Sequence, residues 1–318
     1  MSSGEEEVVP KVLNLEVIKR GLSQVGRSFD GSSYAFLKLD LQNKQIETTC
    51  EDLSKYQHLR YVNFNGNNFQ NIEVLSKLPF LVRLDLKGNR ISNLEVFNKE
   101  ETFGYLQQLD LSENSIRALT PIKLPKLTKL SLSKNEISSA DNFEGHDKLE
   151  FLDLRGNRLS SMKGLKSMPN LTELYLAENN ILAFEGLQET SSIKTLHLRK
   201  NGITSFEDEK LPELPELTYL NLRENELTEV SSLGLLKRYS KLSKLNLLDC
   251  PLNADPSGSV KKEVLIVLPG IPYLNKEEVT QEDREEAYEE AKERHRLEEE
   301  AKKEAERAAQ EAEEEQDS

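Results

Sequence analysis

The sequence has few of the residues on which metal sites and catalytic centres depend. It contains no tryptophan, only two cysteines and only four histidines, at His58, His146, His197 and His295. Cys50 and Cys250 lie in the first and last copies of the repeat described below and are too far apart to pair, so we expect reduced thiols in an intracellular compartment and no disulfide framework. The histidines are scattered, and no P-loop, nucleophile-elbow or zinc-ligand spacing occurs. We therefore predict that the protein is not an enzyme and holds no cofactor or metal.

Long apolar runs are also absent, and acidic residues outnumber basic ones. No stretch reaches the ~20 apolar residues of a membrane-spanning helix, and the acidic residues 1–7 lack the basic and apolar regions of a secretory signal. The net charge is −14, and residues 276–318 carry 19 acidic and 8 basic residues, so the rest carries about −3. Such a chain, with no visible basic stripe, is poorly suited to bind phosphates. We expect no nucleic acid, membrane or small-molecule substrate among its partners.

What the sequence does contain is a repeat dominated by leucine. Residues 149–171 read LEFLDLRGNRLSSMKGLKSMPNL, in which Leu149, Leu152 and Leu154 are followed by Asn157 and Leu159. This is the L-x-x-L-x-L-x-x-N-x-L frame of a leucine-rich repeat. The alternation of Leu152 and Leu154 predicts a short strand with one buried face, and the apolar residues at every third position beyond it favour tight 3₁₀-like turns. Such a unit buries its apolar side only when it stacks on copies of itself.

Copies of this frame run through most of the chain. Eight complete frames place an asparagine every 21–25 residues, a period typical of this repeat class. These asparagines are Asn67, Asn89, Asn114, Asn135, Asn157, Asn179, Asn201 and Asn225. A first degenerate frame has Lys44 in the asparagine position, and a last one has Cys250. We therefore predict an α/β fold, a leucine-rich repeat solenoid of about ten coils with a parallel sheet on its concave face.

The repeated asparagine has a structural explanation. Where a coil leaves its strand, backbone groups lose their sheet partners, and burying them unpaired is costly. An inward-pointing amide offers donors and an acceptor to those groups. We expect the asparagines to form a ladder from coil to coil, and Asn157→Ala to destabilise the fold by roughly 1–3 kcal/mol.

Both ends of a solenoid need caps. We expect residues 1–12 to be disordered and residues 13–33 to form a capping helix and loop. The helix is predicted over roughly 13–26, because Leu15, Ile18, Leu22 and Val25 fall at helical spacing. Residues 34–275 then form the solenoid with its carboxyl-terminal cap. The cap is expected to be a short apolar helix followed by a segment that turns back and seals the end of the solenoid.

The last part of the chain, residues 276–318, predicts a long charged helix. It consists almost entirely of Glu, Lys, Arg and Ala, without Gly or Pro, and pairs such as Glu290 and Arg294 lie at i,i+4 in the favourable order. A stripe of alanines runs along it, but Arg294 and Glu298 interrupt the stripe, and alanine is too small for a strong coiled coil. Two alternatives stay open: a solvated single helix, or a helix that lies along another protein.

The outward positions of the predicted strands form the concave face. Aromatic and arginine side chains on an exposed face are typical of protein interfaces. The candidate protein-binding residues are Tyr61, Arg83, Asp85, Asp110, Phe151, Asp153, Arg155, Tyr175, His197, Arg199, Tyr219 and Arg223. The alternative is that alternating charges there only keep the solenoid in solution, but three aromatic residues recur on one face and favour an interface.

Two resemblances rest on these residues. The frame L-x-x-L-x-L-x-x-N-x-I-x-x-I-x-x-L, closed by the LPGIPYL of residues 268–274, resembles the SDS22-like subclass, which is known for intracellular scaffolds and regulators. The HLRYV of residues 58–62, the LLDCP of residues 247–251 and a cap that runs straight into an acidic helix resemble the leucine-rich repeat-containing protein 23 family. This similarity extends from about residue 13 to about residue 300, and that family belongs to the radial spokes of the ciliary and flagellar axoneme.

The closer resemblance implies a non-catalytic scaffold in the cytoplasm, at the cytoskeleton of the cilium or flagellum axoneme. It implies a role in radial-spoke assembly and cell motility, with other radial-spoke or axonemal proteins as partners. Two other functions stay open. One is an SDS22-like regulatory subunit of a protein phosphatase, and the other is a dynein- or microtubule-associated axonemal adaptor.

Overall fold

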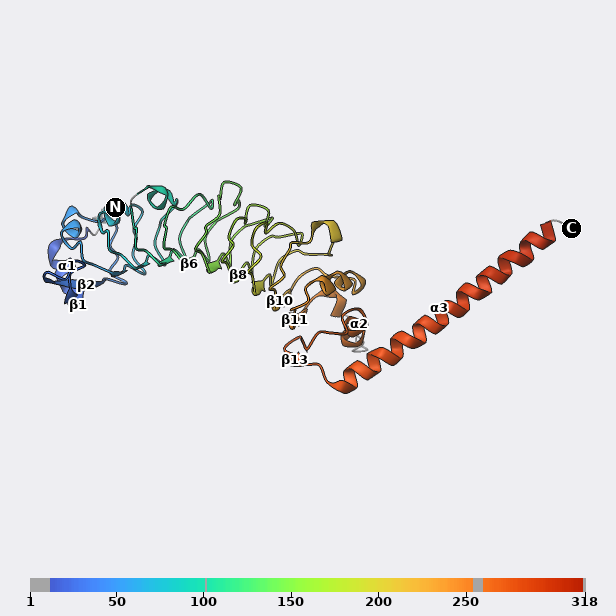
Figure 1. Ribbon diagram of the computed structural model, residues 1–318. Coiled ribbons are helices and arrows are strands. Elements are labelled where there is room, and N and C mark those ends of the chain that lie inside the picture. Colours follow the sequence, from blue (N-terminus) through green and yellow to red (C-terminus); the bar gives the residue numbers. More distant parts are fainter. Residues whose placement is uncertain (1–11, 101, 254–259, 317–318) are drawn as a thin grey trace, which may run out of the picture.

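The protein is an arched solenoid whose strands line the inner side of the arch (Figure 1). The computed structural model describes residues 12–100, 102–253 and 260–316, with side chains as far as residue 306. Within these residues thirteen strands form one sheet, and the strands follow one another in sequence order. The predicted leucine-rich repeat solenoid with a concave parallel sheet is confirmed.

Each coil contributes one short parallel strand. The strands are β2 Tyr34–Asp40, β3 Tyr61–Asn63, β4 Arg83–Asp85, β5 Gln108–Asp110, β6 Lys129–Ser131, β7 Phe151–Asp153, β8 Glu173–Tyr175, β9 Thr195–His197, β10 Tyr219–Asn221, β11 Lys244–Asn246 and β12 Tyr273–Leu274. Their register keeps the central leucines aligned, so Leu152 pairs with Leu130 on one side and Leu174 on the other. Equivalent residues therefore stack in rows along the arch.

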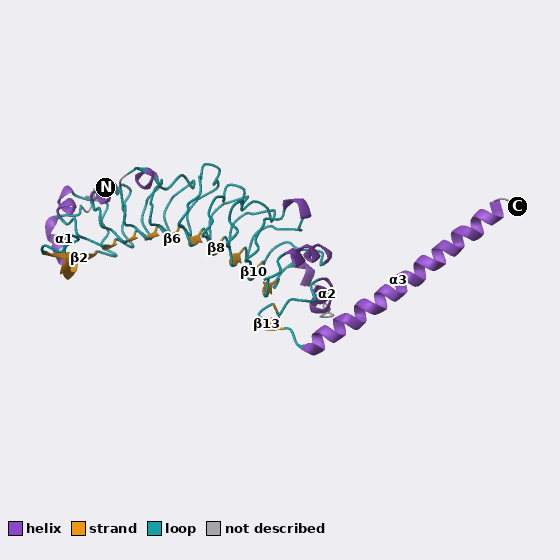
Figure 2. Cartoon of the chain, viewed as in Figure 1, coloured by secondary structure: helices purple, strands orange, loops and turns teal. Residues whose placement is uncertain are grey.

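The outer side of the arch consists of turns and short 3₁₀ helices (Figure 2). These helices are η1 Glu51–Lys55, η2 Glu73–Lys77, η3 Glu95–Asn98, η4 Asp208–Lys210, η5 Ser231–Arg238 and η6 Pro251–Asn253. The core lies between the two sides as one continuous stripe. In the coil that begins at Leu149, the frame residues Leu152, Leu159, Met162 and Leu165 are at most 1% exposed, because each stacks on its equivalents in the neighbouring coils.

The eight frame asparagines are buried beneath the point where each strand ends. The Nδ2 of Asn157 donates to the carbonyl oxygens of Leu132 in the preceding coil and Leu154 in its own, both at 2.9 Å. Its Oδ1 accepts from the backbone N–H of Ile137 at 3.0 Å. The other seven make the same set of bonds. The ladder therefore runs from side chain to backbone across each coil boundary.

The amino-terminal cap differs from the prediction. The helix predicted over 13–26 is wrong beyond residue 21: α1 spans only Leu15–Gly21, and β1 Leu22–Arg27 then pairs antiparallel with β2. Glycine at 21 and 26 weakens a helix there, and the first parallel strand needs hydrogen-bond partners for its outer edge. Of the residues expected to be disordered, only Val12 is described, and it bridges to Thr48; residues 1–11 lie outside the described part.

The loop between β1 and β2 reaches along the rim of the solenoid through Phe29. Its ring stacks on Phe80, two coils away, with centroids 4.3 Å apart and planes at 11°. It also meets Tyr105 edge-on at 5.0 Å. The hairpin is thus fastened to the third and fourth parallel strands by aromatic contacts and not by β1 alone.

Replacing Phe29 with alanine should loosen this hairpin. The change removes two aromatic contacts, each worth about 0.5–1.5 kcal/mol, so we expect hydrogen exchange of the β1 amides to accelerate roughly tenfold. Tyr34→Ala is the matched control, since Tyr34 lies in the same hairpin and is 73% exposed. Equal exchange in both variants would contradict a fastening role for Phe29.

The carboxyl-terminal cap holds the long helix to the solenoid. It comprises α2 Val260–Val267, β12, β13 Glu277–Glu278 and α3 Gln281–Gln316. Residues 276–280, which we predicted to be helical, instead include β13, antiparallel to β12. Ala287 of α3 is 3% exposed, and α3 pairs with α2 through Asp283–Lys261, Glu286–Lys262 and Arg294–Glu263. Beyond these contacts α3 projects away from the arch (Figure 1).

Candidate protein-binding surface

The twelve predicted binding residues lie in three rows on the concave side, because the strands are in register. Tyr61, Arg83, Phe151 and Tyr219 occupy the first position of their strands. Asp85, Asp110, Asp153, Tyr175 and His197 occupy the third. Arg155, Arg199 and Arg223 follow two residues beyond each strand. The sheet brings together members of the last four strands of this series, and it separates Tyr61 and Arg83 from them by several coils.

An aromatic cluster spans four adjacent coils from β7 to β10. Phe151 and Tyr175 have ring centroids 5.3 Å apart, and Tyr175 stacks on His197 at 4.7 Å with planes at 14°. His197 in turn meets Tyr219 edge-on at 5.0 Å. The sequence pattern predicted that these side chains share a face, and the register brings them into contact. The aromatic cluster is therefore a continuous, partly exposed surface.

Ion pairs border this aromatic cluster. Arg155 donates two hydrogen bonds to Asp153, from Nε to Oδ1 at 2.9 Å and from Nη2 to Oδ2 at 2.6 Å. The guanidinium of Arg155 also lies 5.3 Å from the centre of the Tyr175 ring. Further along, Arg199 pairs with Glu224 and Arg223 with Asp249. These arginines are therefore held in place, and their charges are neutralised by the paired carboxylates. What they present to a partner protein is the flat surface of the guanidinium group more than an unpaired charge.

His197 and Tyr175 of the aromatic cluster are uncharged near neutral pH. Burial lowers the pKa of His197, and the nearby Arg155 lowers it further. Burial also raises the pKa of Tyr175 to about 12, helped by the hydrogen bond that its hydroxyl donates to Glu173 at 2.8 Å. A neutral aromatic cluster bordered by ion pairs resembles the apolar core and polar rim of protein interfaces. It suits the recognition of a protein surface.

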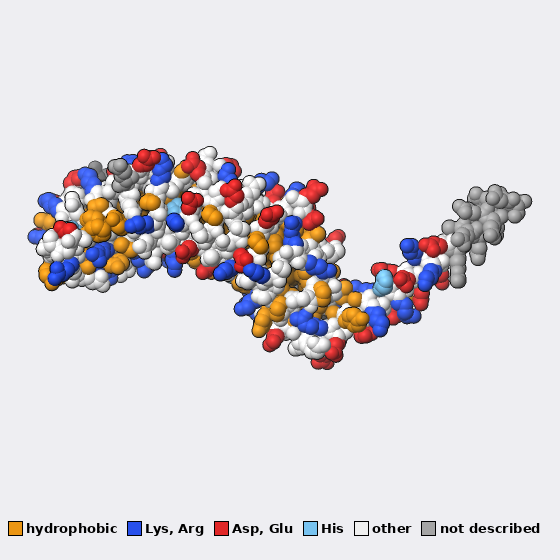
Figure 3. Space-filling model, viewed as in Figure 1, with side chains coloured by type: hydrophobic (Ala, Val, Ile, Leu, Met, Phe, Trp, Pro, Cys, Tyr) orange, Lys and Arg blue, Asp and Glu red, His pale blue; other side chains and the backbone are white. Residues whose placement is uncertain are grey.

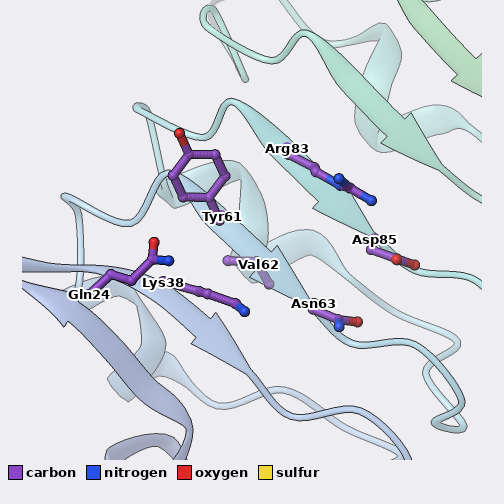
Figure 4. Close-up of a pocket in the computed structure, with 7 residues that line it drawn as sticks. All are labelled: Gln24, Lys38, Tyr61, Val62, Asn63, Arg83 and Asp85. Carbon is purple, nitrogen blue, oxygen red and sulfur yellow. The ribbon is translucent and has the colours of Figure 1, made fainter.

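A second hollow lies at the other end of the concave side. A cavity of about 450 Å³ is lined by Gln24 of β1, Lys38, Tyr61, Val62, Asn63, Arg83 and Asp85 (Figure 4). Burial raises the pKa of Asp85. The sequence pattern missed Gln24 because it assigned that residue to a helix. No signal in the sequence marked this hollow, since β1 forms one of its walls.

The two cysteines and His146 lie apart from these surfaces. Cys50 and Cys250 are free thiols, and burial raises the pKa of Cys250, whose Sγ donates to the Leu222 carbonyl. His146 is half-buried, with its Nε2 2.9 Å from the carbonyl oxygen of Leu124. Across the described residues no three His, Cys, Asp or Glu side chains are placed to hold a metal ion. No helix in that part of the chain is long and apolar enough to cross a membrane.

Comparison with known proteins identifies the family. A family model described as leucine-rich repeat matches residues 146–305, and a second matches residues 105–159. Human leucine-rich repeat-containing protein 23 is 33% identical over 282 residues, which cover 89% of this chain and 80% of the human protein. The chain belongs to the leucine-rich repeat-containing protein 23 family. The resemblance drawn from the sequence is thereby confirmed.

Comparison with solved structures finds other leucine-rich repeat proteins, one of which has a TM-score above 0.5. The leucine-rich repeat ectodomain of the plant receptor kinase GASSHO1/SCHENGEN3 from Arabidopsis thaliana is 19% identical, with a TM-score of 0.51 over 72% of this chain and 29% of that one. Internalin C2 of Listeria monocytogenes is 22% identical, with a TM-score of 0.49 over 66% and 80%. Leucine-rich repeat proteins bind other proteins and are generally non-catalytic, so this member of the leucine-rich repeat-containing protein 23 family is a protein-interaction scaffold.

Proposed function

We propose that this protein is a structural component of the ciliary or flagellar axoneme, held in a radial spoke and needed for spoke assembly and motility. The observation that carries the proposal is the match to the leucine-rich repeat-containing protein 23 family over 89% of the chain, together with the radial-spoke role that the resemblance implies. Its place in the cell would be the cytoplasm, at the cytoskeleton of the axoneme. Its partners would be other radial-spoke or axonemal proteins.

Two binding surfaces at a fixed angle support a bracing role. The aromatic cluster of β7–β10 would contact one spoke subunit, and α3 would lie along another. The ion pairs Arg294–Glu263 and Asp283–Lys261, with buried Ala287, fix the direction in which α3 leaves the solenoid. A helix of 36 residues reaches about 54 Å. The chain therefore joins two partners across a defined distance.

Removing residues 297–318 should weaken incorporation into axonemes and leave the solenoid folded. The cut falls beyond the contacts of α3 with α2, so the denaturation midpoint should not change. A cut at residue 276 would also remove Ala287 and β13 and is less informative. We would express both the truncated and the complete chain in ciliated cells that lack the endogenous protein. Incorporation of the truncated chain at the level of the complete one would contradict a docking role for the projecting helix.

Fractionation of demembranated cilia tests the proposed location. We expect the protein to remain with the salt-washed axoneme, and to be lost from axonemes that lack radial spokes. Retention in spoke-deficient axonemes would instead favour the dynein- or microtubule-associated adaptor. Release into the soluble matrix, with co-purification of a phosphatase catalytic subunit, would favour the phosphatase regulator.

A further inference from the structure

The rim of the sheet where β2 to β6 begin carries an unusual set of cations. We call this surface the basic edge and define it by five side chains: Arg27, Arg60, Arg83, Lys126 and Lys129. Arg27 comes from the amino-terminal hairpin, and its carbonyl lies 3.4 Å from the Arg60 guanidinium. The others lie within two residues of the first leucine of their frames, in the coils of β3, β4 and β6; the coil of β5 has Gln107 and Gln108 there. Neighbouring strands lie about 4.8 Å apart, so the basic edge spans on the order of 25 Å.

The cations of the basic edge lack acidic partners within the described residues. No carboxylate oxygen there lies within 4.0 Å of any of the five, although ion pairs are frequent elsewhere in the same region of the chain. The arginines on the other half of the concave side are paired, as in Arg155–Asp153 and Arg199–Glu224. The equivalent frame positions of later coils include Glu150, Glu173 and Glu216, whereas those of β3 to β6 include no Asp or Glu.

Aromatic side chains lie among these cations. The stacked pair Phe29 and Phe80 continues to Tyr105, and the Lys126 ammonium lies 3.8 Å from the centre of the Tyr105 ring. Phe29 is 51% exposed and Tyr61 40% exposed. Figure 3 shows apolar and basic side chains gathered together on the visible face at this end of the solenoid. Exposed aromatic and arginine side chains contribute most of the binding energy at protein interfaces.

We propose that the basic edge is the docking surface for an acidic segment of a partner protein that also carries an apolar anchor. The unpaired cations would receive its carboxylates, and the aromatic row would receive the anchor. The inference deepens the proposed function by naming the partner's chemistry. It rests only on the scaffold role and holds whichever assembly contains that partner.

The neighbouring row of aspartates favours a peptide over a nucleic acid. Asp85 and Asp110 lie two residues beyond the edge positions of their strands, at a distance of about 7 Å along the strand. A phosphate backbone carries negative charge at every unit and would be repelled by that row. A peptide can place acidic residues on one side and neutral or basic residues on the other. Its pattern of charge can therefore match both rows.

The basic edge also corrects an assumption made from the sequence. The chain was expected to have no basic stripe, because no run of lysine or arginine occurs in the repeats. The stripe exists, but no coil contributes more than two of its residues, and the coil of β5 contributes none. Because one to two repeat periods separate them in sequence, these cations come together only when the coils are stacked.

A defined acidic probe tests the proposal on the full chain. The probe is a fluorescein-labelled peptide of repeated Glu-Glu-Leu-Glu units, with a Gln-for-Glu peptide and an Ala-for-Leu peptide as comparisons, and binding is followed by fluorescence anisotropy. The variant R60E/R83E reverses two edge cations. The matched control K194E/K244E makes the same charge change at the equivalent frame positions of later coils. A second variant, K126E/K129E, tests the edge independently if R60E/R83E fails to fold.

We expect the acidic peptide to bind the wild-type chain and K194E/K244E equally, and to bind R60E/R83E and K126E/K129E at least about tenfold more weakly. Binding should weaken with salt, and either comparison peptide should bind less well. Failure of the probe to bind the wild-type chain, or equal losses in edge and control variants, would overturn the proposal. Tighter binding of oligothymidylate would reassign the edge to nucleic acid. Self-association that R60E/R83E abolishes would reassign it to the acidic α3 of a second copy. Neither reassignment would affect the axonemal fractionation, so the two proposals fail separately.

Discussion

Replacing Gly145 with alanine should destabilise the solenoid by roughly 2–5 kcal/mol, the sum of backbone strain and overpacking. Gly145 has φ +89°, a backbone conformation that residues with a Cβ rarely adopt. A Cβ at this position would lie 2.3 Å from the carbonyl oxygen of Ser167 and 2.7 Å from that of Lys166. Both oxygens belong to the backbone of the next coil. Relief would therefore require two coils to separate.

Gly31→Ala is the matched control for this change. Gly31 has φ +75°, but a Cβ there meets nothing within 4 Å, so it isolates the backbone strain at about 1 kcal/mol. Chemical denaturation followed by circular dichroism measures both variants. Repeat proteins can unfold in stages, so the full curve should be compared and not only its midpoint. Equal losses in the two variants would show that coil-to-coil contact at Gly145 adds nothing to the strain.

The repeats were predictable because each coil solves the same packing problem. A single frame such as that of Asn157 is weak evidence for the fold. Eight frames that recur with the same period all predict the same buried leucines and the same inward-pointing amide. The aromatic cluster of Phe151, Tyr175, His197 and Tyr219 followed from the same periodicity, since register fixes which residues become neighbours. What the sequence left open was whether these rings touch or are spread out by charged neighbours.

The ends and edges were less predictable because each occurs once. Helical spacing relates Leu15, Ile18, Leu22 and Val25. The structure instead pairs Leu22 with Leu39 and Val25 with Phe36, because β1 supplies hydrogen-bond partners for the outer edge of β2. Val25 is then 62% exposed, an outcome that no amphipathic pattern predicts. Residues 277–278 have a helix-forming composition, but they pair with β12 to close the sheet. In both places the hydrogen-bonding needs of a terminal strand outweighed local propensity.

One structural side chain escaped the sequence analysis for the same reason. Asn275 lies outside the frame, in the carboxyl-terminal cap, but its Oδ1 accepts from the backbone N–H of Leu247 at 2.7 Å. In the last coil the Sγ of Cys250 donates to the Leu222 carbonyl, one of the carbonyls that a frame asparagine would satisfy. Cys250 of the last coil and Asn275 of the cap thus extend the ladder, although the two side chains differ in chemistry. Only the positions of the orphaned backbone groups connect them.

Asn157→Ala should lower the free energy of unfolding by roughly 1–3 kcal/mol, the range for an orphaned buried group. The change affects three backbone groups: the N–H of Ile137 loses its partner, and the carbonyls of Leu132 and Leu154 lose one donor each but keep the Nδ2 of Asn135 and of Asn179. Two of these belong to the preceding coil, so the loss weakens the boundary between coils as well as the coil itself.

Asn170→Ala is the control, because Asn170 lies in the same coil and makes one exposed bond, to the carbonyl of Asp147. We expect this variant to match the wild type within about 0.5 kcal/mol. Hydrogen exchange then locates the damage in Asn157→Ala. Faster exchange at the amides of Ile137 and Leu159, with those of Leu220 unchanged, indicates a weakened boundary inside an otherwise intact solenoid. A uniform acceleration across all coils would mean that the array unfolds as one unit, and that the ladder stabilises the whole sheet and not each junction separately.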